Sequence, residues 1–488
     1  MTTPTFRWLA ATVATAAVPM VALTGPAWGA APITTGPSSS QSPYLTPSAP
    51  GVSVTSILTV GDSVNNKADG TPYRMVGIPD GLGAYDNGDD TFTVLMNHEL
   101  RPDRGIVRAH GTTGAFVSKW TIAKDDLTVI KGEDLITQVM TATADGGYEP
   151  SSEPLARLCS ADLPEVSAFY DAASGKGYQG RIFMNGEEAG DEGRGFAHLM
   201  DGTSYELPRL GKFSWENSIA HPGTGVKTVV VGTDDTTPGQ VYVYVGEKQA
   251  SGSPIERAGL TNGTLYGVAV DGSALELRAA PFAAGTGFGL QSFGDVSAWT
   301  GAELQAASVS AGVTEWLRPE DGQWDPTAPE DFYFATTDNF DGASRLWRLR
   351  FADLAQPELG GTVEAVLDGT EGQHMMDNMT ISRKGRVLLQ EDPGNQDYLA
   401  KVYSYDLNTD RLTEVAAHDA ARFGAGAPGL LTRDEESSGV IDVSHILGQG
   451  RYLLTTQAHY ALGGELVEGG QLMSIRIPWR TLKSPQGT

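Results

Sequence analysis

The 488-residue chain has a single cysteine, Cys159. One thiol cannot form an intramolecular disulfide, and it cannot supply the several thiolates of a cysteine-based zinc site. Cys159 stands in the stretch R-L-C-S-A-D-L-P, which predicts a small core residue rather than a nucleophile. Any metal site must therefore draw mainly on other side chains.

Basic residues are scarce as well. Lys and Arg number 34 against 60 Asp and Glu, which gives a formal net charge of −26. Such a polyanion will not bind nucleic acid or an anionic bilayer by charge alone, but it will attract divalent cations. An anionic substrate such as a phosphate ester could approach only if bound metal reversed the local field. A solubilising acidic surface of an exported protein remains the alternative explanation.

Long apolar runs are missing after the start of the chain. Residues 1–30 predict a signal peptide: Arg7 precedes an apolar stretch from Trp8 to Leu23, which is too short and too rich in Ala and Thr for a membrane span. Residues 31–51 lack apolar content and predict a disordered linker. We expect residues 52–480 to form one domain, residues 481–488 to be a tail, and the mature protein to be a secreted or cell-envelope monomer.

Familiar catalytic signatures are absent. The chain has no G-x-S-x-G, no G-x-x-x-x-G-K-[ST] and no H-E-x-x-H, since Asn97-His98-Glu99 lacks the second histidine. Residues 424–429 fit G-x-G-x-x-G but contain Pro428 and predict a loop. A serine triad and a nucleotide-binding loop are therefore not expected.

Helix-length amphipathic patterns are few, and short apolar or alternating segments separated by turns dominate. These patterns predict an all-β protein. Six segments resemble one another (F-V-S-K-W-T-I, V-Y-V-Y-V, L-Y-G-V-A-V, L-W-R-L-R-F, V-Y-S-Y-D and L-M-S-I-R-I), as in a degenerate repeat with insertions. A six-bladed β-propeller is the predicted fold, with a β-sandwich pair as the alternative. Helices are expected only at 133–140, 161–173 and 301–307, and long loops at 189–215 and 315–330.

Acidic or amide residues follow many of the apolar segments. In a propeller the innermost strands converge, so that carboxylates from different blades can meet near the axis. Oxygen ligands of this type suit Ca²⁺, although each pair alone could be a solvated turn. The pattern comprises Asn97-His98-Glu99, Glu187-Glu188, Glu216-Asn217, Asp234-Asp235, Asp338-Asn339, Asp377-Asn378, Glu391-Asp392, Glu435-Glu436 and Gln457-Ala458-His459.

The order of these motifs resembles the PhoX-type alkaline phosphatases. The shared features are N-H-E after a strand, the paired E-E, F-x-x-E-N followed by D-D, D-N-M-T-I-S-x-x-G, E-x-S-G and Q-x-H, spread from about residue 94 to beyond residue 456. The resemblance implies a calcium-dependent propeller with a mixed metal cluster at its axis. It also implies hydrolysis of phosphate monoesters, as small phosphorylated substrates, outside the cytoplasm.

Carried over motif by motif, the resemblance assigns roles to individual residues. Metal ligands would be Glu187, Glu188, Glu216 and Glu436, followed by Glu99, Asp377 and Glu391. Gln457 and His459 would lie at the axis end. We expect Glu188 and Arg433 in catalysis, and Arg194, Lys212 and His459 in substrate binding.

Two departures from the family pattern bear on the cofactors. The family has a cysteine directly before its E-E pair that serves iron, whereas Gly186 stands there in this chain. Loss of that thiolate favours Ca²⁺ and weakens the case for Fe³⁺. No twin-arginine export signal is present either. Two other functions remain open: a non-catalytic calcium-stabilised propeller that binds extracellular polymers through Trp316 and Trp324, and a lactonase- or phytase-like hydrolase.

Overall fold

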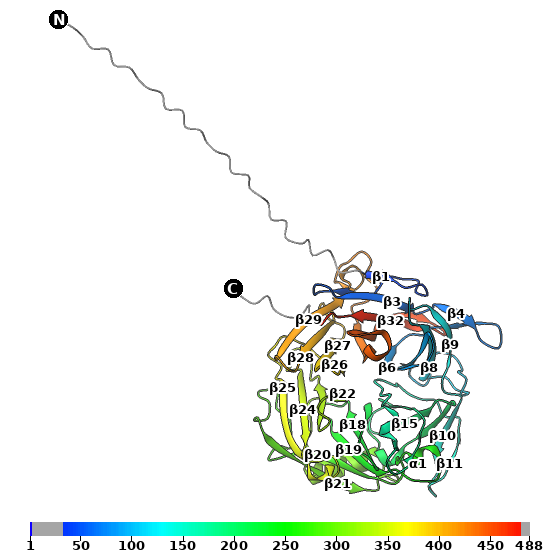
Figure 1. The fold of residues 1–488 in the computed structure, drawn as a ribbon, viewed down its shortest axis with the longest axis vertical. Helices are drawn as coiled ribbons and strands as arrows, with labels where there is room; N and C mark the ends of the chain where they lie inside the picture. Colours follow the sequence, from blue (N-terminus) through cyan, green and yellow to red (C-terminus); the bar gives the residue numbers. More distant parts are fainter. Residues whose placement is uncertain (2–32, 480–488) are drawn as a thin grey trace.

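Six blades of β-strands are arranged as a ring in the computed structural model, which describes Met1 and residues 33–479 (Figure 1). The predicted all-β, six-bladed propeller is confirmed. We number the sheets as blades I to VI, each from its innermost strand outward. Blade I comprises β6 (Pro79–Asp86), β7 (Thr91–His98), β8 (Phe116–Ala123) and β9 (Val129–Asp134). Blade II comprises β14 (Ile182–Gly186), β15 (Gly195–Leu199), β16 (Thr203–Glu206), β10 (Gln138–Ala142) and β11 (Tyr148–Ser151).

The next two blades are joined at their outer edges, because β21 pairs with β25. Blade III comprises β17 (Trp215–Ala220), β18 (Lys227–Asp234), β19 (Val241–Glu247), β20 (Thr264–Val270) and β21 (Thr286–Gly294). Blade IV comprises β22 (Pro319–Trp324), β23 (Asp331–Thr336), β24 (Arg345–Phe351) and β25 (Gly361–Leu367).

The last two blades combine both ends of the described chain. Blade V comprises β26 (Met376–Ile381), β27 (Arg386–Glu391), β28 (Lys401–Asp406), β29 (Arg411–His418) and β2 (Leu45–Pro47). Blade VI comprises β30 (Glu435–Asp442), β31 (Arg451–Gly463), β32 (Val467–Arg476), β3 (Ser53–Thr59) and β1 (Ile33–Thr35). Because β3 pairs antiparallel with β32, strands from both ends of the described chain share blade VI and close the ring (Figure 1).

The predicted linker is wrong for the part that the structure describes. Residues 33–51 contribute β1 and β2 to blades VI and V, and Tyr44 and Leu45 are fully buried. The segment has no apolar run that would mark it as ordered. Single apolar residues between Ser and Pro are enough to anchor it, because a neighbouring blade supplies the rest of the core. The predicted signal peptide and the tail 481–488 lie outside the described residues.

Short elements lie between the blades. The helix predicted at 301–307 is confirmed as part of α2 (Gly301–Ala311), which a Thr300–Glu303 capping box begins. The helix predicted at 133–140 is wrong, because that stretch contains the end of β9, a short connection and the start of β10; within 161–173 only η1 (Val166–Ala168) is helical. The remaining elements are α1 (Pro254–Arg257), α3 (Ala420–Phe423), α4 (Ser444–Leu447), η2 (Pro208–Leu210), η3 (Pro357–Leu359), β4 (Ser63–Asn66), β5 (Pro72–Arg74), β12 (Tyr170–Asp171) and β13 (Lys176–Gly177).

Apolar side chains fill the spaces between adjacent blades. Trp316 and Trp324 belong to such a core between blades III and IV and are 0% and 4% exposed. The expectation of an exposed tryptophan loop at 315–330 is therefore wrong. The other expected loop, 189–215, contains β15 and β16. No described helix has the length and apolar content that a membrane crossing requires.

The same irregularity recurs where the inner strands begin. In blade I, Pro79 pairs with His98 but Leu82 pairs with Met96, so that β6 has one residue more than β7 in this interval. The same β-bulge begins β17, β22 and β26. A bulge turns a side chain out of the regular alternation. Here it does so at the same end of four inner strands.

Candidate metal centre

Residues 158–162 supply a matching bulged strand to blade II. Leu158 bridges Glu187 and Asp162 bridges Met184, which again leaves one extra residue between the two pairs. This segment lies inside β14 and runs antiparallel to it. Blade II therefore has an inner strand that its sequence did not reveal.

In each inner strand, the residue that follows the first paired residue points into one axial cavity of about 430 Å³. Each blade contributes one such side chain, and all except one are carboxylates. The six are Asp80, Cys159, Glu216, Glu320, Asp377 and Glu436, the second residues of β6, of segment 158–162, and of β17, β22, β26 and β30.

A second set comes from the neighbouring strands, which run in the opposite direction and end at the same place. Glu99, Glu188, Asp235 and Asp392 follow the ends of β7, β14, β18 and β27, and β31 supplies Gln457 and His459. With Asp434 and Glu468, eleven carboxylates line the cavity, against two arginines and one histidine. Burial in one place would be very costly for so many like charges without cations.

The described residues contain three groups of possible metal ligands, and within each group the ligand atoms lie within 4.8 Å of one another. The first two consist only of carboxylates, Glu216 with Glu320 and Asp377, and Asp377 with Asp392 and Glu436. Asp377 is common to both. The third joins Asp80 and Glu99 to the Cys159 thiol. Oxygen-only groups suit Ca²⁺, and the thiol-containing group suits a softer ion.

The electrostatics of the cavity favour bound cations. Burial and the nearby carboxylates Glu99, Glu216 and Glu436 raise the pKa of Asp80 well above its usual range. Burial, with Asp235, raises the pKa of Glu216 to about 8. One carboxylate oxygen of Glu216 is buried without a hydrogen-bond partner among the described residues. Cations would satisfy this atom and return the carboxyl groups to their ionised form.

Three cationic side chains reach the cavity and pair with its carboxylates. Arg157 Nε donates to Glu99 at 2.8 Å and the same guanidinium contacts Glu188. Arg318 Nε lies 2.6 Å from Asp235 and 3.0 Å from Glu320. These arginine side chains are 38% and 27% exposed, so their guanidinium groups also face the open cavity.

His459 is the third cation. Burial opposes its charge, but hydrogen bonds to Glu436 and Glu468 outweigh burial and raise its pKa to about 11. Its Nδ1 lies 2.7 Å from Glu468. The positively charged imidazole, whose Nε2 lies 3.8 Å from Glu436 Oε2, therefore pairs with that carboxylate.

The structure brings part of the sequence-predicted set together. The predicted residues that line the cavity are Glu99, Glu188, Glu216, Asp377, Glu436, Gln457 and His459. Those that do not line it are Glu187, Glu391, Arg433, Arg194 and Lys212.

Each residue outside the cavity has another partner. Arg433 lies 2.5 Å from Asp397, and Lys212 lies 3.1 Å from Glu192. Glu391 accepts hydrogen bonds from the backbone N–H groups of His374 and Lys401 and from the Tyr398 hydroxyl. Side chains alternate at a strand end, so Asp392 faces the axis while Glu391 faces the blade.

Glu187 also points away from the axis. Both of its carboxylate oxygens accept from Arg194, at 2.7 and 2.8 Å, and Glu187 is 3% exposed. We expect Glu187→Gln to lower the free energy of unfolding by about 3 kcal/mol, because it breaks a buried ion pair. Bound metal, measured by elemental analysis after dialysis, should stay at the wild-type level. Glu216→Gln, a change within one of the carboxylate groups, should lose metal instead, and a loss in Glu187→Gln would contradict this placement.

Several site residues were not predicted. Asp80 and Glu320 follow proline and precede glycine or Asp-Gly, a pattern typical of turns, and Arg157 and Arg318 stand in no recognised motif. The expectation that Cys159 is a plain core residue is wrong, because its thiol donates to Glu188 Oε2 at 3.2 Å inside the cavity. Gly186 could not carry a thiol here, since a Cβ atom would lie 2.3 Å from Trp215 Cβ.

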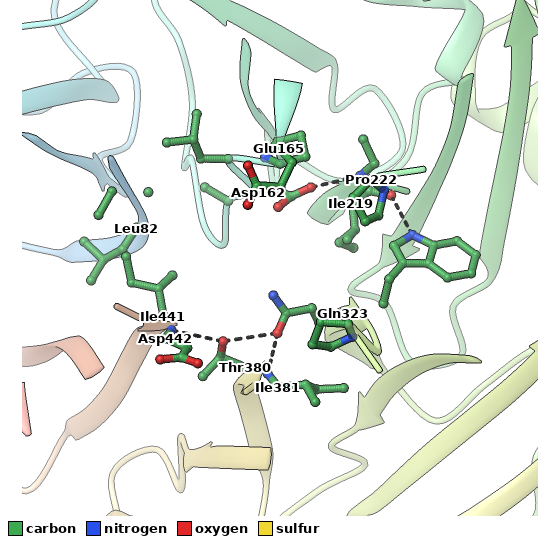
Figure 2. Close-up of a pocket in the computed structure, with 18 of the residues that line it drawn as sticks. Leu82, Asp162, Glu165, Ile219, Pro222, Gln323, Thr380, Ile381, Ile441 and Asp442 are labelled. Carbon is green, nitrogen blue, oxygen red and sulfur yellow. Dashed lines mark hydrogen bonds between the residues drawn. The ribbon is translucent and has the colours of Figure 1, made fainter. Parts of the chain in front are cut away.

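A second cavity, of about 510 Å³, lies at the opposite ends of the inner strands (Figure 2). Gln323 Oε1 accepts from the Ile381 N–H and, at 3.1 Å, from the Thr380 hydroxyl, which in turn accepts from the Asp442 N–H at 3.3 Å. Asp162 accepts from the Ala220 N–H at 2.9 Å. These bonds connect neighbouring blades, and none of the three ligand groups found in the described residues lies at this end.

The fold and the site together define a six-bladed propeller with an acidic centre on its axis, where three groups of side chains could hold metal ions. The family model "Alkaline phosphatase PhoX" matches residues 200–435. PhoX of Pseudomonas fluorescens in complex with vanadate, a transition state analogue, shares the fold, with a TM-score of 0.63, 13% identity, and coverage of 88% of this chain and 96% of that chain. The resemblance to the PhoX-type alkaline phosphatases is thereby confirmed.

Other solved structures are more distant. Regucalcin of Agrobacterium tumefaciens, a calcium-binding protein, has 13% identity and a TM-score of 0.33 over 83% of this chain and 93% of its own. Trypanosoma rangeli sialidase with the inhibitor DANA has 11% identity and a TM-score of 0.35 over 88% of this chain and 60% of its own. No curated protein matches the chain. These TM-scores are too low to bear on function.

Proposed function

We propose that the protein is an exported, calcium-dependent phosphatase that hydrolyses phosphate monoesters. The observation that carries this proposal is the axial cavity, where six blades contribute eleven carboxylates and two arginines. The match to a phosphatase family supports the same reaction class. The substrate would be a small phosphorylated molecule, and we expect the protein to act as a monomer.

Two kinds of metal fit the side chains present. The two carboxylate groups that share Asp377 would hold Ca²⁺, and the group of Asp80, Glu99 and Cys159 would accept Fe³⁺ or another transition-metal ion that binds thiolate. Cys159 thus compensates for the glycine at position 186. Cations bound here would supply positive charge for the phosphate and lower the pKa of water, so that it becomes a nucleophile near neutral pH.

The remaining steps fall to the chain's own side chains. Arg157 and Arg318 would hold the non-bridging phosphate oxygens, taking the role expected of Arg433, Arg194 and Lys212, because they are the arginines of the described chain that line the cavity. Glu188 would orient Arg157, which it contacts. His459 would keep Glu436 ionised and oriented.

Turnover of a chromogenic phosphate monoester tests the proposed function. Metal-free protein should be inactive, and Ca²⁺, alone or together with iron, should restore hydrolysis between neutral and alkaline pH. No turnover under any of these metal conditions would reject the phosphatase. The alternative polymer-binding function loses its support, since Trp316 and Trp324 are buried. Hydrolysis of a lactone with no release of phosphate would identify the other hydrolase class.

Replacing either cavity arginine should weaken substrate binding. We expect Arg318→Gln and Arg157→Gln each to raise KM about tenfold or more, because a hydrogen bond to a charged group contributes about 1.5–3 kcal/mol. Steady-state kinetics with metal-saturated protein provide the measurement. Arg433→Gln is the matched control and should change KM by less than about twofold, as an exposed ion pair contributes little. The reverse order of effects would place the phosphate elsewhere.

A further inference from the structure

A buried chain of hydrogen bonds ends on the strand that carries Cys159. Asn97 Nδ2 donates to the carbonyl oxygens of Cys159 at 2.6 Å and of Ser160 at 3.2 Å. Asn185 Nδ2 donates to Asn97 Oδ1 at 2.9 Å, and His198 Nε2 lies 2.8 Å from Asn185 Oδ1. Asn97, Asn185 and His198 are each 0% exposed.

The carbonyl oxygens of Cys159 and Ser160, at one end of this series of hydrogen bonds, determine which group donates and which accepts in every bond. Carbonyl oxygens can only accept, so Asn97 must present its amide nitrogen to them and its oxygen to Asn185. Asn185 then has only its oxygen left for His198, whose Nε2 must carry the proton. His198 Nδ1 is buried without a partner among the described residues, so the ring is neutral. Burial accordingly lowers the pKa of His198 to about 3.

The bulge at residues 158–162 of blade II needs hydrogen bonds from side chains more than the bulges that begin β6, β17, β22 and β26 do. Residues 158–162 pair with β14 only at their two ends, which leaves the backbone of Cys159 and Ser160 outside the ladder. The Gly81 N–H gives the Cys159 carbonyl one further bond, at 3.1 Å. A Cβ atom at Gly81 would lie 2.4 Å from the Ala161 nitrogen, so the close approach of β6 also depends on glycine.

We propose that Asn97, Asn185 and His198 are positioning residues, which lock the bulge between blades I and II and thereby aim the Cys159 thiol at Asp80 and Glu99. The inference rests on the proposed function only in so far as the thiol is a metal ligand. None of the three residues lines the axial cavity. They act through the backbone of Cys159, in the way that supporting hydrogen bonds orient ligands in metal sites.

Cys159 is the only cysteine, so its thiol reports directly on this arrangement. The experiment titrates full-length, metal-free protein with Cd²⁺ and follows the ultraviolet absorption of the cadmium–thiolate bond. In parallel, it measures the rate of alkylation of Cys159 by iodoacetamide. We expect Asn97→Leu to weaken Cd²⁺ binding about tenfold or more, which is typical for the loss of a supporting residue, and to speed alkylation.

Further variants keep the test decisive. His198→Phe retains a ring and removes only the N–H that donates to Asn185, so it should weaken Cd²⁺ binding and speed alkylation less than Asn97→Leu does. His198→Gln keeps a side-chain N–H donor and should therefore bind Cd²⁺ as the wild type does. Ser118→Ala is the control: Ser118 is buried in the same blade and bonds to His98 and Trp120, away from Cys159. Ser118→Ala should lower Tm without changing Cd²⁺ binding or the alkylation rate of Cys159.

The outcomes distinguish a failure of the positioning role from a failure of the proposed phosphatase function. Wild-type cadmium binding and alkylation in a folded Asn97→Leu protein would overturn the inference, and if that variant does not fold, unchanged values in His198→Phe would do so. The thiol measurements stand whether or not the protein hydrolyses phosphate esters. An absence of hydrolysis in the wild type would reject only the proposed function.

Discussion

Replacement of Asp377 by asparagine should abolish phosphatase activity and remove more than one metal ion. Asp377 is the one residue common to both carboxylate groups of the cavity. It is also the second residue of β26, where the bulge fixes its direction toward the axis. Because metal charge stabilises a phosphoryl transition state by several kcal/mol, we expect kcat/KM to fall by about three orders of magnitude.

The same variant should have an opposite effect on the metal-free protein. Burial, with Glu320, Glu216 and Glu436 nearby, raises the pKa of Asp377 well above its usual range. A neutral amide removes this repulsion, so the Tm of metal-free Asp377→Asn should exceed that of metal-free wild type. Added Ca²⁺ should raise the wild-type Tm strongly and the variant Tm only slightly. Calorimetry with and without Ca²⁺ measures both effects.

Glu391→Gln is the matched control for this experiment. Glu391 is 0% exposed and ends the neighbouring strand β27, but its partners are His374, Tyr398 and Lys401 rather than cavity residues. We expect its metal content and its Ca²⁺-dependent Tm shift to match wild type. An Asp377→Asn protein with full activity and a normal Ca²⁺ response would contradict the assignment of Asp377 to the metal centre.

The stability of the metal-free protein should fall steeply as pH rises. Burial and neighbouring carboxylates raise the pKa of Glu216 to about 8 and of Glu436 to about 7 from an ordinary value of 4.5. A folded state with raised carboxyl pKa values binds more protons than the unfolded state, so unfolding becomes easier at higher pH. The loss should begin near pH 4.5 and continue to about pH 8, and should amount to several kcal/mol.

Bound Ca²⁺ should largely remove this dependence, because the carboxylates are then ionised in the folded state. Urea unfolding between pH 4.5 and pH 8.5, with chelator or with saturating Ca²⁺, provides the comparison. Glu216→Gln should flatten the metal-free profile, while Glu414→Gln, a change on the outer strand β29, should not. A metal-free profile that rises or stays flat over this range would contradict the electrostatic description of the cavity.

Much of the fold could be predicted from the sequence, because apolar alternation and turns mark the outer strands of each blade. The inner strands were harder to recognise. β6 and β22 begin with P-D-G and P-E-D-G, which read as turns, and segment 158–162 pairs with β14 only at its ends. The carboxylates of these strands, and the thiol of Cys159, were consequently missed or given another role.

Adjacent acidic residues raised a different difficulty. Each pair at a strand end places one side chain at the axis and the other in the blade, and which one depends on strand register. Sequence alone cannot separate Glu187 from Glu188, or Glu391 from Asp392. The structure separates them through the Glu187–Arg194 ion pair and through the hydrogen bonds that surround Glu391.

The central claim is that carboxylates from all parts of the ring hold cations on the propeller axis. Anomalous diffraction from crystals grown with Ca²⁺ tests it most directly. The structure predicts calcium peaks on the axis at about 2.3–2.6 Å from oxygens of Asp377 and of its neighbours Glu216, Glu320, Asp392 and Glu436. An axial cavity without any cation peak in such crystals would contradict the claim.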